Sequence, residues 1–199
     1  MKIIGLSGQS GAGKTTALEE LRALGATVCD CDLVSREVME KGKPCSRELI
    51  SLFGDGIASP DGEIYRKKLA ELVFFDKNKL ERLTEITHRY IKERIFSLID
   101  EARGRGDTLF VIDAPLLFES GLDKICDLTL AVTAPYEMRI ARITERDGIT
   151  RELAEKRLDA QLSEEELSLL ADEVIENSGT LEDLKKAVRD FAKGKGIVK

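Results

Sequence analysis

The pattern of apolar and polar positions predicts a strand, a turn, a helix and a second strand at the start of the chain. Residues 2–7 form a short apolar run, and a glycine-rich stretch over 8–13 follows it. Beyond Thr15, leucines recur at helical spacing until Gly25, which ends the pattern. A second run over 26–30 completes a strand–helix–strand unit. Such a unit is typical of a parallel sheet covered by helices on both faces.

The pattern changes between residues 34 and 104. Periodicity there is mostly helical, and glycine or proline interrupts it at 41–44, 53–56 and 59–62. The apolar run 72–75 is compatible with a helix or with a short strand. We expect the whole segment to be a helical insertion between strands of the sheet.

The rest of the chain returns to alternating strands and helices. Strands are predicted at 108–113, 128–132 and 173–176, and a final helix at 180–192. The charged segment 136–171 has helical spacing, and Asp147-Gly148 divides it into two arms. We expect the tail from Gly194 to be frayed.

Composition narrows the class of protein further. The 199 residues suffice for one compact domain with insertions, and a net charge of −6 argues against a general nucleic-acid binder. No apolar run approaches the ~18 residues of a membrane span, and the first run is too short for a signal peptide. Four cysteines without paired spacing and one histidine favour neither a disulfide framework nor a Cys/His zinc site. We expect a cytoplasmic monomer or small homo-oligomer with reduced thiols, and no obligate protein, nucleic-acid or membrane partner.

One local motif carries specific chemistry. Residues 8–15 read Gly-Gln-Ser-Gly-Ala-Gly-Lys-Thr, which satisfies G-x-x-x-x-G-K-[ST] between a predicted strand and a predicted helix. Backbone N–H groups of such a loop surround phosphates, the lysine reaches the β- and γ-phosphates, and the hydroxyl coordinates Mg²⁺. We therefore predict that ATP and Mg²⁺ bind through Gly8, Ser10, Gly11, Ala12, Gly13, Lys14, Thr15 and Thr16.

Other motifs decide between classes of phosphate-loop protein. A motor ATPase places Asp-Glu at the end of its second diagnostic strand, but the strand here ends in Asp113-Ala114-Pro115. A GTPase carries Asp-x-x-Gly and Asn-Lys-x-Asp; the first is absent, and Asn78-Lys79-Leu80-Glu81 lacks the final Asp of the second. Both classes are therefore disfavoured relative to a kinase.

Two carboxylates follow the second predicted strand. If Cys29-Asp30-Cys31-Asp32 is extended, its period of two places Asp30 and Asp32 on one face, near the ligand edge of the sheet. There a carboxylate can take the proton of an attacking alcohol. The alternative is that they cap a following helix over 33–40.

Three arginines form a stripe on the predicted helix after residue 136. Arg139, Arg142 and Arg146 fall within about 60° of one another around a helix axis. They form either a solvated charged face or part of a lid that neutralises a transferring phosphoryl group.

Taken together, the chain resembles the dephospho-CoA kinase family along nearly its whole length. The shared features are the strand leading into the phosphate loop, Asp30-Cys31-Asp32 with Arg36, the stretches 61–66 and 113–119, Thr87-His88, Arg142, Arg146-Asp147-Gly148, Ala160-Gln161 and 171–177. The chain departs from the family pattern at Arg89, where proline is usual, and at Met138-Arg139, where glutamine is common.

The resemblance implies an α/β fold of the P-loop kinase type, with a five-stranded parallel sheet flanked by helices. It implies a nucleotide-binding core over 1–33, 105–137 and 167–199, a helical CoA-substrate domain over 34–104 and a lid over 138–166. The implied reaction is phosphorylation of the ribose 3′-hydroxyl of dephospho-CoA by ATP.

Roles follow for individual residues. Catalysis is expected from Lys14, Asp32 and Arg142, and metal binding from Thr15 and Asp113. Arg146 and Asn177 join the loop in nucleotide binding, and the acceptor is expected to contact Asp32, Arg66, His88, Asp113 and Leu116. Two alternatives stay open: another small kinase with an alcohol acceptor, and a nucleotide-dependent switch or binding module without an acceptor.

Overall fold

A computed structural model describes residues 1–197 and contains two compact units. The core unit consists of Met1–Cys29 together with the chain from Ala102 onward. The helical unit is Asp30–Glu101. The predicted separation of the lid from the core as a third part stays a prediction.

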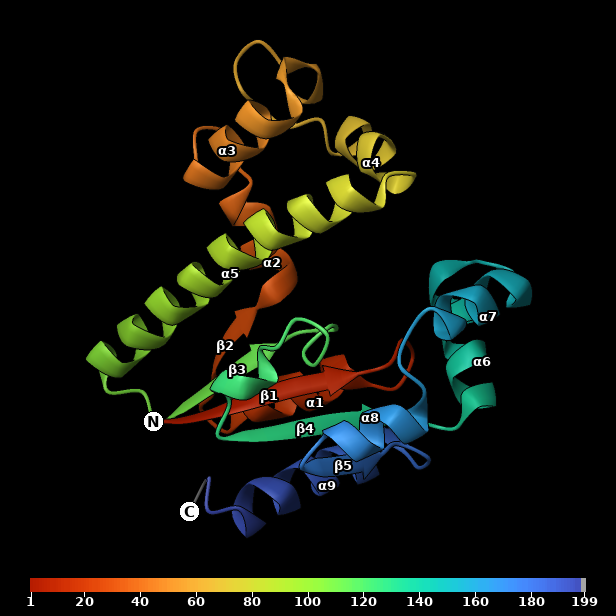
Figure 1. The fold of residues 1–199 in the computed structure, drawn as a ribbon. Helices are drawn as coiled ribbons and strands as arrows, with labels where there is room; N and C mark the ends of the chain where they lie inside the picture. The colour runs from red at the N-terminus through yellow and green to blue at the C-terminus, as the bar shows by residue number, and fades with distance from the viewer. Residues whose placement is uncertain (198–199) are drawn as a thin grey trace. The chain divides into compact units, whose positions relative to one another are not determined.

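The core unit is built on a five-stranded parallel sheet, as predicted (Figure 1). The strands are β1 (Lys2–Gly8), β2 (Thr27–Asp30), β3 (Leu109–Asp113), β4 (Leu128–Thr133) and β5 (Glu173–Glu176), in the order β2-β3-β1-β4-β5. Leu6 of β1 is in register with Asp113 of β3 and with Leu130 of β4. The carboxyl ends of the central strands therefore meet at one edge, where α/β folds bind ligands.

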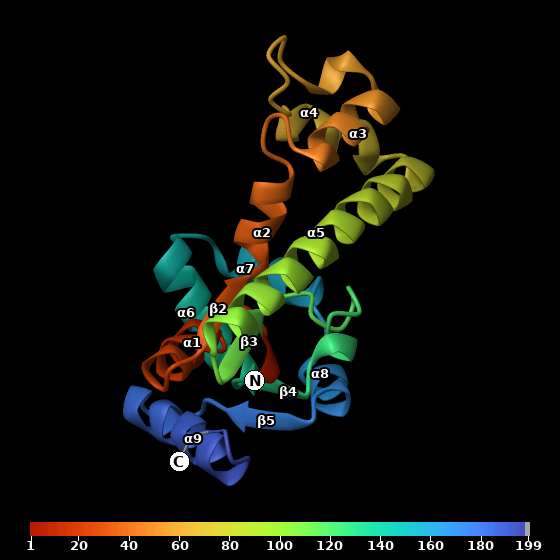
Figure 2. The same cartoon turned by 90° about the vertical axis from the view of Figure 1, so that its left-hand side faces the viewer.

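Two helices cover one face of this sheet. Helices α1 (Lys14–Ala23) and α9 (Leu181–Gly194) lie side by side (Figures 1 and 2). Alternate strand residues meet them in a single buried cluster whose largest members are Ile4, Leu6, Leu18, Leu21, Leu109, Val111, Leu130, Val132, Ile175, Leu184 and Val188. The period of two along the strands thus assigns each apolar side chain to a face.

On the other face, the segment after β3 approaches the sheet closely. A Cβ at Gly5 would lie 2.8 Å from Cys126 Sγ and from a methyl carbon of Leu117. A short 3₁₀ helix, η2 (Asp123–Ile125), precedes this contact. Glycine at position 5 therefore lets the segment pack directly on β1.

Between β4 and β5 the chain forms three helices, α6 (Tyr136–Asp147), α7 (Arg151–Asp159) and α8 (Glu164–Leu170). Ile140 and Ile143 of α6 pack with Ala154 and Leu158 of α7 in a small core. Gly148 ends α6 with φ of +63°, which confirms the predicted break there.

The helical unit contains α2 (Cys31–Val38), α3 (Pro44–Phe53), η1 (Asp55–Ile57), α4 (Arg66–Phe74) and most of α5 (Lys77–Arg105), a helix of 29 residues. The predicted helical character of this segment is confirmed. The run 72–75 lies at the end of α4 and not in a strand. Helical packing wins there because Leu69 and Val73, four residues apart, are both buried.

The expectation of a frayed tail is wrong as far as residue 197. Helix α9 continues to Gly194, and Ile197 donates a backbone hydrogen bond of 2.8 Å to Ala192. Ile197 is partly buried against the sheet cluster, and this contact supports the hydrogen-bonded turn after α9. Residues 198–199, also included in that expectation, lie outside the described residues.

Candidate active site

The phosphate loop joins the last residue of β1, Gly8, to the first residue of α1, Lys14. Gly11 and Gly13 have φ of +76° and +103°, which residues with a Cβ rarely adopt. A Cβ at Gly11 would also lie 2.8 Å from the backbone oxygen of Arg139 on α6. Glycine at these two positions permits a tight loop that packs against α6.

Side chains from two distant segments hold the backbone oxygens of the loop. Arg142 of α6 donates through Nη1 to the oxygen of Gly11 at 3.1 Å. Asn177, which directly follows β5, donates through Nδ2 to the oxygen of Ala12 at 2.8 Å and is itself buried. These bonds fix the orientation of two successive peptide groups in the loop.

The amide groups at the start of α1 are available to an anion. The first intrahelical bond runs from the Ala17 amide to the Gly13 oxygen, so the amides of residues 13–16 have no partner within the helix. Neither Gly13 at the N-cap nor an acidic residue of the first turn occupies them. A helix N-terminus of this kind attracts phosphate through its N–H groups and its dipole.

Lys14 and Asp113 form an ion pair beside these amides. Asp113 is the last residue of β3, and both side chains are mostly shielded from water, with exposed fractions of 19% for Lys14 and 10% for Asp113. The structure thus brings together the predicted lysine and the predicted metal-binding carboxylate. Thr15, which is exposed, is the second residue of α1.

A cavity of about 240 Å³ adjoins the loop. It is lined by Gly13, Thr16, Arg142, Asn177, Gly179, Leu181 and Leu184. Its walls are partly apolar, and Arg142 and Asn177 are polar residues among those that line it. A planar base with polar edges suits such a lining, since ligand pockets combine apolar walls with a few polar groups.

The three arginines of the stripe have different surroundings. Arg139 is buried, donates through Nε to the Ala134 oxygen at 2.8 Å, and its guanidinium carbon lies 5.5 Å from the ring centre of Tyr136. Burial lowers its pKa. Arg142 lines the cavity beside the loop. Arg146 is exposed and pairs with Asp147 at 2.7 Å, which raises the pKa of its guanidinium. Equal spacing along α6 therefore does not give equal environments.

The expected extension of Cys29-Asp30-Cys31-Asp32 is wrong. Strand β2 ends at Asp30, and α2 already begins at Cys31. The Asp30 carboxylate accepts from the Asp32 and Leu33 amides at 2.9 and 3.1 Å, so Asp30 caps the helix. The hydrogen bonds from the free amides at the start of α2 to the Asp30 carboxylate favour the helix over an extended conformation of residues 31 and 32. Asp32 lies in the first turn of α2 and does not serve as this cap.

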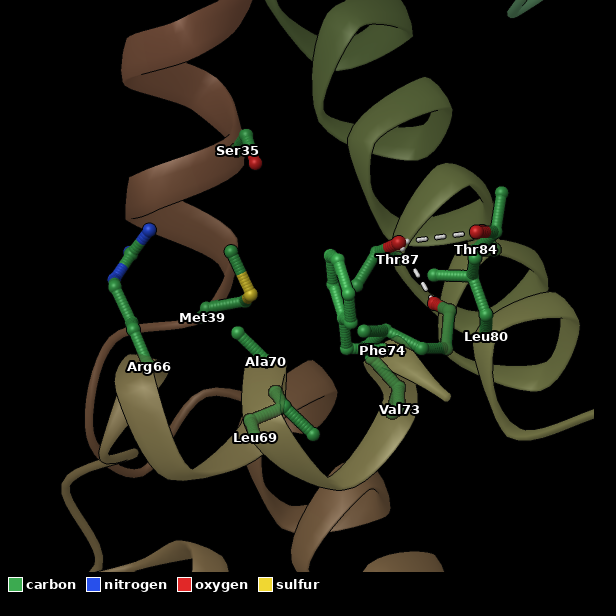
Figure 3. Close-up of a pocket in the computed structure, with 11 residues that line it drawn as sticks. Ser35, Met39, Arg66, Leu69, Ala70, Val73, Phe74, Leu80, Thr84 and Thr87 are labelled. Atoms are coloured by element: carbon green, nitrogen blue, oxygen red, sulfur yellow. Dashed lines mark hydrogen bonds between the residues drawn. The ribbon is translucent and has the colours of Figure 1, made fainter. Parts of the chain in front are cut away.

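The helical unit has a larger cavity of about 520 Å³ between α2, α4 and the start of α5 (Figure 3). Its wall is mostly apolar, with Met39, Leu69, Ala70, Val73, Phe74, Leu80 and Leu83 among the lining residues. Arg66, Ser35, Thr84 and Thr87 add polar groups. Figure 3 shows Arg66 and Met39 on one side of the cavity and Thr87 on the other.

Two predicted acceptor residues lie apart from these cavities. His88 follows Thr87 but does not line the cavity of the helical unit. It is half-buried, and burial together with the nearby Lys92 lowers its pKa. Leu116 is 59% exposed, in the turn after β3. The assigned roles of both residues stay predictions.

Sequence reasoning missed several residues that the structure places around the loop. Gln9 and Leu162 contact each other there, and Gly179, Leu181 and Leu184 line the cavity beside it. The apolar wall of the cavity in the helical unit was missed as well. The signal in the sequence was the apolar run 72–75, of which Val73 and Phe74 line the cavity.

The sheet order, the loop and the paired Lys14–Asp113 define a phosphate-loop kinase. Shikimate kinase from Acinetobacter baumannii shares this fold, with a TM-score of 0.53 and 17% identity over 98% of this chain and 94% of that one. Dephospho-CoA kinase from Campylobacter jejuni has the same fold, with a TM-score of 0.64 and 23% identity over 97% of this chain and 96% of its own. A solved protein from Thermus thermophilus is more similar, with a TM-score of 0.81 and 34% identity over 97% of each chain.

Sequence comparison identifies the family. A sequence model of dephospho-CoA kinase matches residues 2–183. Dephospho-CoA kinase from Fusobacterium nucleatum is 45% identical over 95% of this chain and 96% of its own. The corresponding protein from Aquifex aeolicus is 42% identical over 95% of each. The chain belongs to the dephospho-CoA kinase family, whose known function is the final step of coenzyme A biosynthesis.

Family membership makes the chain an enzyme, a kinase that acts on a small molecule and takes phosphate from a nucleotide. No helix within residues 1–197 combines the length and the apolar character needed to cross a membrane.

Proposed function

We propose that the donor is ATP, that Mg²⁺ is required, and that the loop of the core unit holds the donor phosphates. The uncapped start of α1 beside the Lys14–Asp113 pair is the observation that carries this proposal. In it the first-turn amides and Lys14 hold the β- and γ-phosphates. The cavity lined by Arg142 and Asn177 receives the nucleoside. Such preorganised positive groups stabilise the charge of a transferring phosphoryl group.

The residues beside the loop fit the way in which nucleotide kinases bind Mg²⁺. The residues described, 1–197, contain no cluster of three or more Asp, Glu, His or Cys side chains able to enclose a metal. Mg²⁺ in kinases takes one or two protein oxygen ligands and completes its shell with phosphates and water. Thr15 and Asp113 supply those oxygen ligands in this proposal. The bound ion neutralises charge on the β- and γ-phosphates.

Asp32 is the proposed general base. Asp30 uses its carboxylate to cap α2, which leaves Asp32 as the carboxylate of this pair that is not committed to the cap. As the 3′-oxygen of dephospho-CoA bonds to the γ-phosphorus, Asp32 takes the hydroxyl proton. The bond from the γ-phosphorus to the bridging oxygen breaks, and ADP leaves.

The helical unit is the proposed site of the acceptor. Dephospho-CoA carries a diphosphate and a long pantetheine arm with apolar carbons. The cavity of about 520 Å³ has apolar walls suited to that arm (Figure 3). Arg66 on its wall suits the diphosphate, because guanidinium groups bind phosphate oxygens in pairs.

The lid is proposed to close over the donor with Arg142 and Arg146. Arg142 already bonds to the loop, whereas Arg146 is paired with Asp147 and has to leave that partner to reach a phosphate. Closure excludes water, which would otherwise accept the phosphoryl group.

The test is ADP release from ATP with and without dephospho-CoA, in Mg²⁺ and in EDTA, with the product identified by mass and by the position of its phosphate. We expect release that depends on the acceptor and on Mg²⁺, and a product phosphorylated at the 3′-oxygen. Release that ignores dephospho-CoA but responds to shikimate or another small alcohol contradicts the acceptor. Nucleotide binding without transfer to any alcohol indicates a switch or binding module.

A further inference from the structure

The phosphate loop is contacted by helix α6 of the proposed lid and also by the connection that follows α7. On the side of α6, the Arg139 backbone packs on Gly11 and Arg142 bonds to the Gly11 oxygen. On the other side, the connection 160–163 leads from α7 into α8 and contacts the start of the loop. The second contact has no role in the function proposed above.

That second contact is made by the only two glutamines of the chain. Gln9 donates through Nε2 to the backbone oxygen of Leu162 at 2.8 Å. The Ser10 amide donates to Oε1 of Gln161 at 2.9 Å. We name these four residues, Gln9, Ser10, Gln161 and Leu162, the glutamine clasp. Two neighbouring residues of the loop thus donate hydrogen bonds to two neighbouring residues of the connection after α7. More than 150 positions of the sequence separate the donors from the acceptors.

Gln9 is the buried member of the clasp, and Ser10, Gln161 and Leu162 are half-buried. Gln9 is only 6% exposed, and a cavity of about 20 Å³ beside it is lined by both glutamines and Leu162. Oε1 of Gln9 is buried and has no hydrogen-bond partner among the described residues. Burying such an oxygen is unfavourable, and an apolar side chain of similar size would avoid the cost. Compared with an apolar residue, Gln9 adds the hydrogen bond to the Leu162 oxygen.

Together with the contacts described earlier, the clasp completes the support of the loop. The Gln9 side chain, the Ser10 amide, the Gly11 oxygen and the Ala12 oxygen are each bound by a residue outside the loop. The Ala12 amide turns back to the Gln9 oxygen at 3.1 Å. The amides of residues 13–16, at the start of α1, have no partner within the helix and face the phosphate in this proposal. A loop that is held in its binding conformation loses less conformational entropy when the ligand arrives.

We infer that Gln161 is a positioning residue for the nucleotide, acting through the Ser10 amide, and that the clasp links nucleotide binding to the order of the lid connection. The inference rests on the proposal that the loop binds ATP phosphates. By reciprocity, a nucleotide that stabilises the loop conformation also stabilises residues 160–163.

The main test replaces Gln161 by methionine, which has similar length and no oxygen acceptor. We expect Gln161→Met to raise the KM for ATP and the Kd of a non-hydrolysable ATP analogue about 5- to 20-fold, consistent with the loss of one or two hydrogen bonds. The kcat at saturating substrates and the KM for dephospho-CoA should stay within about twofold of wild type, because Gln161 touches neither reacting group. Asn78→Leu, which removes an exposed amide elsewhere, is the matched control and should leave all constants unchanged.

A second variant keeps the test valid if the first does not fold. Gln9→Met should raise the same KM, and the double variant should lose little more than the worse single variant, since both bonds support one contact. Fully additive losses overturn the clasp as a unit. Unchanged or tighter analogue binding in the single variants overturns the positioning role, and tighter binding means that Gln161 competes with phosphate for the Ser10 amide.

A nucleotide-free measurement separates the failure of this inference from the failure of the proposed function. The chain has four side-chain amides, those of Gln9, Asn78, Gln161 and Asn177, so their NMR signals are few enough to assign. The Gln9 amide protons should exchange with solvent at least about tenfold more slowly than those of the exposed Asn78, and Gln161→Met should reduce that difference. Equal exchange at Gln9 and Asn78 overturns the clasp. Absence of acceptor-dependent ADP release from wild type overturns only the proposed function.

Discussion

Lys14 and Asp113 form an ion pair at the carboxyl edge of the sheet, although 99 positions separate them in the chain. The pair exists because β1 and β3 are neighbours in register, so the residue that ends β3 comes to the loop that follows β1. In the proposed function Lys14 holds the donor phosphates and Asp113 supplies a ligand to Mg²⁺, so the ion pair joins two groups that have separate roles in the reaction.

Lys14→Met tests the pair from the side of the lysine. We expect kcat to fall at least about 10³-fold, because a preorganised charge on the transferring group is lost. The variant should also be less stable by about 1–3 kcal/mol, since it removes the lysine ammonium group from the shielded Asp113 carboxylate. Turnover and urea unfolding measure the two effects. In the double variant with Asp113→Asn, stability should recover while activity does not, and recovered activity contradicts the assigned role.

The two aspartates after β2 can be separated by their effects. Asp32→Asn should lower kcat about 10²- to 10⁴-fold, the usual contribution of a positioned base, without changing the melting temperature. Asp30→Asn should be mild, because asparagine also caps helices, whereas Asp30→Ala should cost about 1 kcal/mol of stability. Steady-state kinetics and thermal unfolding decide. If Asp30→Asn abolishes turnover and Asp32→Asn does not, the base is Asp30.

The arginine stripe gives a third comparison. Arg142→Met should raise the KM for ATP about tenfold, because the Gly11 oxygen loses its hydrogen-bond donor and the cavity proposed for the nucleoside loses a polar lining residue. Arg139→Met should change the free energy of unfolding by less than about 1 kcal/mol, since an apolar side chain can replace a buried arginine that has few partners. Isothermal calorimetry with an ATP analogue and urea unfolding provide the readouts. Equal effects of both variants on nucleotide binding contradict the different environments found on α6.

The strands and the phosphate loop could be predicted from the sequence because both are encoded locally. A short apolar run specifies a buried strand, and Gly11, Gly13 and Lys14 occur at the fixed spacing that the loop requires. The break at Gly148 was equally readable, since glycine readily adopts the positive φ that ends a helix.

What could not be predicted depends on contacts between distant segments or on competition between local structures. Nothing in the sequence places Gln161 on the Ser10 amide, 151 positions away. The sequence allowed two interpretations of Asp30, as part of an extended segment or as a helix cap. Only the observed start of α2 at Cys31 decides between them. Spacing along α6 gave Arg139 and Arg146 a common face, but tertiary packing buried one and left the other in solvent.

His88 gives a prediction for pH dependence. Burial holds its pKa below the ordinary 6.5, and Lys92 lowers it further. Between the two values the unfolded chain binds more protons than the folded one, so the contribution of His88 to stability is complete above pH 6.5 and is lost as the pH falls. Because His88 is the only histidine, its ring signals in proton NMR are unambiguous. The midpoint should lie below 6.5, and His88→Gln should remove this part of the acid sensitivity in urea unfolding. A midpoint at or above 6.5 contradicts the shift.

Ala70 allows the cavity of the helical unit to be filled without removing any polar group. It is an exposed alanine on α4, and its side chain borders the cavity (Figure 3). Ala70→Trp should raise the KM for dephospho-CoA about tenfold or more by occupying space proposed for the pantetheine arm, and leave the KM for ATP unchanged. Ala23→Trp, at an exposed position of α1, is the matched control and should alter neither constant. A short acceptor without the arm, such as adenosine 5′-diphosphate, should be used equally by Ala70→Trp and wild type. If Ala70→Trp impairs both acceptors alike, the cavity does not hold the arm, and α4 acts on the acceptor only through the fold of the helical unit.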